Sequence, residues 1–141
     1  MKNLLIVTLI SLFFITDISA QNNLAHTRIS ILTCGPGEDL YSLFGHTAIR
    51  IIDSTNHTDT VYNWGGFTFD QPYFYIKFMR GKLLYFSSAD YFPDFMYEYV
   101  VEHRNVYEQV LNIDSAAKKH VLDAVNFNLS GDNRFYKYDF L

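Results

Sequence analysis

Residues 33–50, TCGPGEDLYSLFGHTAIR, contain the one histidine of the chain that directly follows a glycine. The glycine and proline residues at 35–37 end a preceding strand, and residues 38–44 are long enough for one or two helical turns. Gly45 then returns the chain to an extended conformation, which places His46 at a loop-to-strand junction. Because imidazole titrates near neutral pH, a histidine facing a cleft there is suited to act as a general base. The alternative is a hydrogen-bonded structural histidine.

Three short segments around His46 alternate as half-buried β-strands do: residues 28–34 (RISILTC), 46–53 (HTAIRIID) and 60–64 (TVYNW). Polar turn residues separate the second segment from the third, so an antiparallel hairpin is expected. Asn63, on the returning strand, is then expected to lie beside His46.

The rest of the chain alternates between helical and extended patterns. Helices are expected to begin at Asp70, Asp90 and Asp114, where a capping residue precedes a helical pattern. Further extended segments are expected over residues 82–88, 104–112 and 134–141. Together these patterns predict an α+β fold class, with a mixed, mainly antiparallel sheet and about three helices.

Aromatic side chains are concentrated between residues 62 and 99, where 15 of 38 residues are Phe, Tyr or Trp. Helical spacing predicts burial of four of them: Phe74, Phe78, Phe95 and Tyr99. Met96 and Val100 are expected on the same helix face as the last two. The remaining rings exceed what a core needs, which leaves two hypotheses for them: a groove or membrane interface suited to acyl chains, or a patch that docks a partner.

The chain begins with a positive residue, an apolar run and small residues before Gln21, as a signal peptide does. We therefore expect residues 1–20 to be removed after Ala20, with an uncleaved anchor as the alternative. Residues 21–141 are then one domain, because 121 residues do not suffice for two cores. The net charge of −4 favours no nucleic-acid partner. The pattern indicates neither a metal nor a cofactor.

Cys34 is the only cysteine in the sequence, which excludes a disulfide within these residues and a cysteine-based metal site. A thiol beside an imidazole is a potential nucleophile, so Cys34 is one candidate for covalent chemistry. However, it ends a strand and does not begin a helix that would stabilise a thiolate. A buried, packing thiol is the alternative.

Four runs carry a family resemblance: residues 32–50 (LTCGPGEDLYSLFGHTAIR), 61–85 (VYNWGGFTFDQPYFYIKFMRGKLLY), 104–113 (RNVYEQVLNI) and 133–140 (NRFYKYDF). In this order they resemble the N-terminal periplasmic domain of the bacterial lipoprotein N-acyltransferase family Lnb. The resemblance covers residues 28–141. It implies a circularly permuted papain-like fold, in which the histidine strand comes first and a nucleophilic cysteine comes later.

The resemblance also assigns roles to individual residues. His46 matches the general base, and Asn63 matches the residue that orients the imidazole. Glu38, Tyr41 and Arg50 belong to the same motif and are candidates to line the site. In the family, the segment matching residues 134–140 leads into an Asn-Cys-Thr motif that carries the nucleophile. We therefore expect the thiol to lie beyond Leu141, and residues 21–141 alone to be inactive.

The implied activity is transfer of an acyl chain, through a cysteine thioester, from a phospholipid to the N-terminal cysteine amine of a lipoprotein. The expected partners are thus a phospholipid donor, a lipoprotein acceptor and a membrane surface, and the expected location is the periplasm or cell envelope. Two alternatives stay open at this point. One is a papain-like cell-wall amidase or peptidase, and the other is a noncatalytic envelope binding module.

Overall fold

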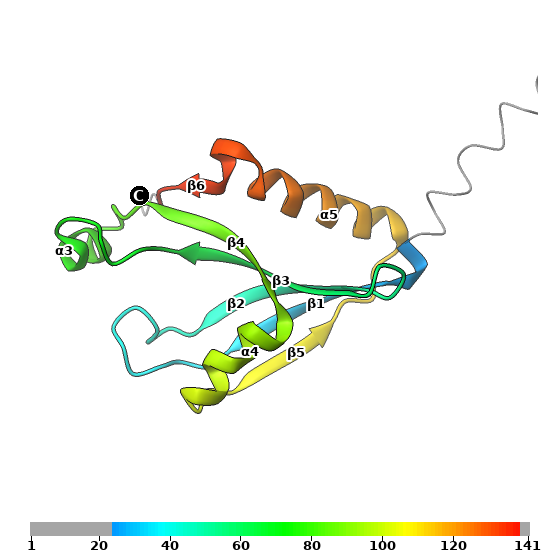
Figure 1. Cartoon of the computed structure of the whole chain (residues 1–141), viewed down its shortest axis with the longest axis horizontal. Coiled ribbons are helices and arrows are strands. Elements are labelled where there is room, and N and C mark those ends of the chain that lie inside the picture. Colours follow the sequence, from blue (N-terminus) through cyan, green and yellow to red (C-terminus); the bar gives the residue numbers. More distant parts are fainter. Residues whose placement is uncertain (1–23, 139–141) are drawn as a thin grey trace, which may run out of the picture.

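The computed structural model describes residues 24–138 as a curved antiparallel sheet with helices on both faces (Figure 1). The predicted signal peptide and the last three residues of the predicted terminal segment lie outside the described residues. The elements in chain order are η1 (Leu24–His26), β1 (Thr27–Cys34), β2 (His46–Asp53), β3 (Thr58–Gly66), α3 (Phe74–Met79), β4 (Tyr85–Tyr91), α4 (Phe92–Val101), β5 (Val106–Val110), α5 (Ser115–Leu129), η2 (Gly131–Arg134) and β6 (Phe135–Tyr136).

The sheet has the strand order β5-β1-β2-β3-β4-β6, and each neighbouring pair is antiparallel. Strands β1 to β4 therefore form a meander, with β5 added beside β1 and β6 beside β4. Cys34 and His46 are register partners in the β1–β2 pair, and Ile49 pairs with Tyr62 across the β2–β3 hairpin. The predicted α+β class, antiparallel sheet and three helices are confirmed. The permuted papain-like arrangement stays a prediction.

The two faces of the sheet carry separate cores because side chains alternate along each strand. On one face, Phe95 and Tyr99 of α4 pack on four buried residues of the sheet, Leu32, Cys34, Ala48 and Val61. On the other face, Val125 of α5 packs on Ile29 and Ile51. A third cluster lies at the α3 end and contains Phe74, Leu83 and Tyr85. The cavity described below opens on the α4 face.

Two of the three expected helix starts are wrong. Asp70 does not cap α3, which begins at Phe74, and the residue before it, Tyr73, has a left-handed φ of 59° and makes no side-chain cap. Asp90 lies inside β4, because this strand keeps pairing with β3 through the partners Thr60 and Tyr91. Asp114 does cap α5, where its carboxylate accepts a hydrogen bond from the backbone N–H of Ala117 at 2.8 Å.

The predicted burial of the four aromatic side chains is largely confirmed. Phe74, Phe95 and Tyr99 are buried, and Phe78 is partly buried against the third cluster. Val100 does not share their environment, since 64% of it is exposed. Residues 38–44 form tight turns closed by hydrogen bonds between residues three apart, and no helix.

Candidate functional site

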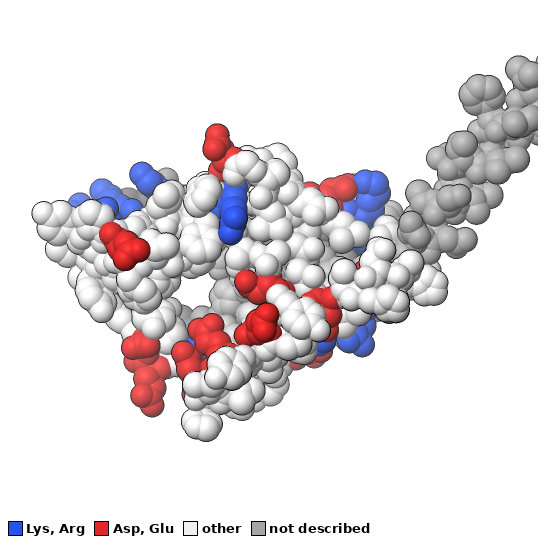
Figure 2. Space-filling view, in the orientation of Figure 1, with Lys and Arg blue, Asp and Glu red and all other residues white. Residues whose placement is uncertain are grey.

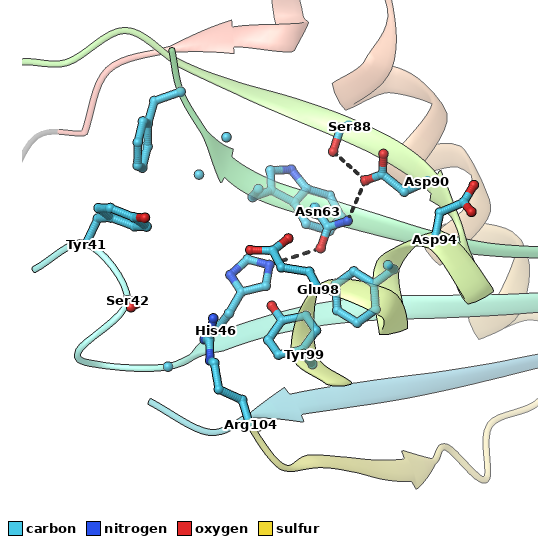
Figure 3. Close-up of a pocket in the computed structure, with 16 residues that line it drawn as sticks. Tyr41, Ser42, His46, Asn63, Ser88, Asp90, Asp94, Glu98, Tyr99 and Arg104 are labelled. Atoms are coloured by element: carbon cyan, nitrogen blue, oxygen red, sulfur yellow. Dashed lines mark hydrogen bonds between the residues drawn. The ribbon is translucent and has the colours of Figure 1, made fainter. Parts of the chain in front are cut away.

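An open cavity of about 460 Å³ lies between the turn before β2, the sheet and α4 (Figure 3). Its walls are formed by Tyr41, Ser42, Gly45, His46, Asn63, Trp64, Gly65, Gly66, Phe67, Ser88, Asp90, Asp94, Phe95, Glu98, Tyr99 and Arg104. Strands β2 and β3 contribute the polar side chains of His46 and Asn63, β4 contributes two polar side chains, and α4 contributes two carboxylates. The imidazole of His46 is therefore half-buried at the edge of a real cavity.

Gly45 positions His46 by a sharp turn at the start of β2. Its φ is +73°, and a Cβ at this residue would clash with the carbonyl oxygen of Cys34. Only glycine combines this backbone conformation with so close an approach. The turn brings the first residue of β2 directly opposite the last residue of β1.

A chain of hydrogen bonds runs from His46 across the sheet. The Nε2 atom of His46 lies 3.0 Å from Oδ1 of Asn63. The Nδ2 atom of Asn63 donates to Oδ2 of Asp90 at 2.8 Å, and the hydroxyl of Ser88 donates to the same oxygen at 2.8 Å. The structure thus brings together His46 and Asn63, as expected from the hairpin. Ser88 and Asp90 are additions, drawn with these contacts in Figure 3.

The sequence context of Asp90 predicts a helix cap, so this carboxylate is not among the site residues expected from the sequence. The register explains its position: Ser88 pairs with Asn63, and Asp90 follows two residues later on the same face of β4. The alternation of polar residues at 88 and 90 was the available signal. It becomes informative only when the pairing partner of β4 is known.

One hydrogen bond links β6, near the end of the described chain, to a residue that lines the cavity. The β3–β4 register shifts between Asn63 and Gly66, and a side chain at Gly66 would clash with the ring of Phe86. This irregularity leaves the backbone N–H of Gly65 free of the ladder, and it donates to the hydroxyl of Tyr136 in β6. The side chain of Tyr136 on β6 therefore contacts β3, the strand that carries Asn63, although β6 itself pairs with β4.

The cavity has an acidic character. Asp90 on β4 and Asp94 and Glu98 on α4 line it, and Arg104 is the only Lys or Arg among its lining residues. Arg104 is already engaged, because its Nε donates to the carbonyl of Gly35 at 3.0 Å and its Nη1 contacts Glu102 at 2.8 Å. Figure 2 shows red side chains beside the hollow in this face. Such a cavity favours a cationic or neutral polar group over an anion.

Cys34 lies opposite His46 in register but is not exposed to the cavity. It is 3% exposed, it belongs to the α4-side core, and it is not among the lining residues. Burial raises the pKa of its thiol, outweighing a hydrogen bond with the Tyr99 side chain that lowers it. A thiol in this environment stays protonated and inaccessible to a substrate.

Of the other three candidates from the motif, only one lines the cavity. Tyr41 lines the cavity, and the hydrogen bond that its hydroxyl donates to Asp39 at 2.7 Å raises its pKa to about 12. Glu38 is exposed in the turn and does not line the cavity. Arg50 also lies outside it.

Arg50 is held on the sheet by three neighbours. Its guanidinium bonds to Asp59 at 2.6 Å and to Glu108 at 3.0 Å, and it lies 3.3 Å from the ring centroid of Phe92. The hydrogen bond with Asp59 is the main reason that the pKa of Arg50 is raised. These contacts link β2, β3, β5 and α4, which is a structural arrangement.

A family model described as the Lnb N-terminal periplasmic domain matches residues 15–141. The chain belongs to this family. Membership places the domain in the periplasm and confirms the family suggested by the sequence motifs. Comparison with the curated proteins and with the solved structures finds no match. Among residues 24–138 of this Lnb domain, no group of three or more His, Cys, Asp or Glu side chains is arranged to hold a metal ion.

Proposed function

We propose that this Lnb domain supplies the general base of a periplasmic thiol acyltransferase, and that the base is His46. The observation that carries the proposal is the hydrogen bond between His46 and Asn63 at the edge of an open cavity. An amide oxygen on one ring nitrogen leaves the other nitrogen available to accept a proton. Because His46 lines the cavity, a substrate can reach its imidazole, which a purely structural role does not require.

In the first proposed step, His46 accepts the proton of a cysteine thiol and the sulfur attacks the ester carbonyl of a phospholipid. The ester C–O bond breaks, and the leaving alcohol takes the proton from the imidazolium, so that a thioester and a lysophospholipid result. In the second step, the acceptor ammonium loses a proton to water and the neutral amine attacks the thioester carbonyl. His46 then accepts the second amine proton, and the C–S bond breaks. The thiolate then recovers the proton, and the acceptor carries a new amide.

We assign the thiol in this scheme to a cysteine other than Cys34, because Cys34 is buried and its pKa is raised. The family resemblance expects this cysteine after the segment that matches residues 134–140. The position of β6 supports the assignment, since Tyr136 bonds to Gly65 on the cavity wall. The acidic cavity supports an amine acceptor, which is cationic before it reacts.

The test uses the full-length protein that contains this chain, in phospholipid vesicles with a diacylated lipopeptide that has a free N-terminal amine. We expect the lipopeptide to gain the mass of one acyl chain, and His46→Gln to abolish the gain. His120→Gln is the matched control, because His120 is exposed on α5, on the opposite face of the sheet. Acyl transfer that persists in His46→Gln contradicts the proposal. Cleavage of cell-wall peptides without acylation would instead establish the amidase alternative.

We also propose that the α3 end of the domain rests on a membrane surface. Large exposed apolar side chains gather there: Leu40, Leu43, Phe44, Phe69, Tyr73, Ile76 and Met79. We call this set the apolar end. Tyr41 joins its two halves, with its ring 5.6 Å from that of Phe67 and 5.5 Å from that of Phe69. Since Tyr41 and Phe67 also line the cavity, the apolar end borders the cavity mouth.

Charge complementarity favours anionic phospholipid as the occupant of the apolar end. Lys77, Arg80 and Lys82 lie on or beside α3, while the whole chain has a net charge of −4. Figure 2 shows blue side chains along one edge of this end of the molecule and red side chains below them. Aromatic rings combined with cations are typical of surfaces that insert into the headgroup region. No helix within residues 24–138 is long and apolar enough to cross a bilayer.

Co-sedimentation with vesicles of phosphatidylglycerol and phosphatidylethanolamine tests this surface. We expect Phe44→Ser combined with Lys77→Glu to weaken binding by the full-length protein, and added salt to weaken binding of the wild type. Phe127→Ser is the control for the loss of an exposed ring, because Phe127 is 62% exposed, against 95% for Phe44, but lies on α5. An equal loss with both variants, or none with either, refutes the surface. His46→Gln should sediment as the wild type does, so this test is independent of catalysis.

A further inference from the structure

Asp90 is the only charged member of the hydrogen-bond chain that runs from His46 through Asn63 to Asp90 and Ser88. It is partly buried on β4, and its Oδ2 accepts two hydrogen bonds, from Nδ2 of Asn63 at 2.8 Å and from the hydroxyl of Ser88 at 2.8 Å. No hydrogen bond joins Asp90 directly to His46 among the described residues. Any hydrogen-bonded effect of this carboxylate on the imidazole therefore passes through Asn63.

We infer that Asp90 is a positioning residue that selects the tautomer of His46 by fixing the amide of Asn63. An ionised carboxylate only accepts hydrogen bonds, so the side of the Asn63 amide that faces Asp90 must be its NH₂ group. The amide oxygen then faces His46 and accepts a hydrogen bond from its Nε2–H. Nδ1 is left as the unprotonated ring nitrogen, which is the atom that serves as the base.

Removing the charge of Asp90 removes the reason for this orientation. The two ends of an amide have nearly the same shape, so a flip of Asn63 changes its hydrogen bonding and little else. A flipped amide donates to Nε2 of His46, which moves the ring proton to Nδ1 and makes the base atom unavailable. The catalytic part of the inference rests on the proposed function, whereas the tautomer is a property of the protein itself.

The tautomer is measured directly by ¹⁵N NMR of the full-length protein labelled at histidine, at about pH 9, where imidazole is ordinarily neutral. Protonated and unprotonated ring nitrogens resonate far apart, and His46→Gln identifies the signals by their loss. We expect a single Nε2–H tautomer in the wild type and a mixture in Asp90→Asn. Asp94→Asn is the matched control, because Asp94 lines the same cavity but makes no hydrogen bond to Asn63 among the contacts described. It should keep the single tautomer.

A reciprocal exchange provides the rescue. In the double variant Asn63→Asp with Asp90→Asn, the amide at 90 donates to the carboxylate at 63, and that carboxylate accepts from Nε2–H of His46. The single tautomer should return. In acyl transfer, kcat should fall about two- to tenfold in Asp90→Asn, in proportion to the fraction of the wrong tautomer, and KM should change less.

A single Nε2–H tautomer in Asp90→Asn overturns the inference, as does a mixture that the double variant does not correct. The result is separable from the general-base proposal. If the tautomer responds as expected while His46→Gln retains acyl transfer, the proposed function fails and the positioning role stands. If His46→Gln is inactive and the tautomer does not respond, only the positioning role fails.

Discussion

Replacing Cys34 by alanine separates the two possible sources of a thiol. Cys34 is the nearest thiol to His46 in register, yet it is 3% exposed and packed against Tyr99. If its role is packing alone, Cys34→Ala in the full-length protein should keep acyl transfer within about twofold of the wild type. It should lower the free energy of unfolding by about 1 kcal/mol, because one small apolar group and one weak hydrogen bond are lost.

The reactivity of Cys34 follows from two factors. Its pKa lies above the ordinary value of 9.0, so the thiolate fraction at pH 7 is below about 1%. Access to a reagent further requires an opening of the core. An opening that costs about 3 kcal/mol slows modification roughly 150-fold relative to the unfolded chain. Native Cys34 should therefore be labelled at least about a hundredfold more slowly than the same residue in urea.

Iodoacetamide labelling followed by peptide mapping measures this ratio for Cys34 separately from any other cysteine. The acyl-transfer assay on Cys34→Ala, with thermal unfolding to verify the fold, provides the second readout. The reasoning is refuted if Cys34 reacts as fast in the native protein as in urea. It is also refuted if the variant is folded and inactive, since the buried thiol would then be the nucleophile.

Three further perturbations test individual parts of the structure. Arg50→Lys should lower the free energy of unfolding by about 1–2 kcal/mol, because paired hydrogen bonds and the contact with an aromatic ring are lost. A loss of activity at unchanged stability would instead indicate that Arg50 belongs to the functional site. Gly45→Ala should destabilise the domain by at least about 1–3 kcal/mol and reduce activity. Gly131→Ala is the control, because Gly131 also has a positive φ but no atom near its Cβ position. An equal melting temperature for the two variants would contradict the clash at Gly45. Burial raises the pKa values of Cys34 and Tyr99 above their ordinary values of 9.0 and 10.0. Both groups therefore bind their protons more tightly in the folded protein. Their contribution to the free energy of unfolding is complete below about pH 9 and is lost as the pH rises. The urea concentration at the midpoint of unfolding should decrease as the pH is raised from about 8 to about 10.5. The decrease should be smaller in the double variant Tyr99→Phe with Cys34→Ala.

Local patterns in the sequence were sufficient where one element determines its own structure. Residues 28–34 and 46–53 were expected as strands, and they coincide with β1 and β2 to within a residue. Asp114 caps α5 as its position before a helical pattern indicates. These features depend on side-chain alternation and capping, which act over a few residues.

Patterns failed where a neighbour in space decided the outcome. The segment expected to end as a strand at 88 continues to Tyr91, because its pairing with β3 extends that far. Asp90 looks like a helix cap from its sequence context, but Asn63 and Ser88 engage its carboxylate instead. Neither partner is detectable without the register.

The sequence by itself determined the family, the sheet-forming strands and the identity of the histidine and asparagine that meet, because motif order and side-chain period are local properties. Only the tertiary structure decided that Cys34 is sealed in the core, that Arg50 links strands outside the cavity, and that Asp90 stands behind Asn63. Burial and hydrogen-bond partners arise from residues distant in the chain, and strand pairing is what brings those residues within reach of one another.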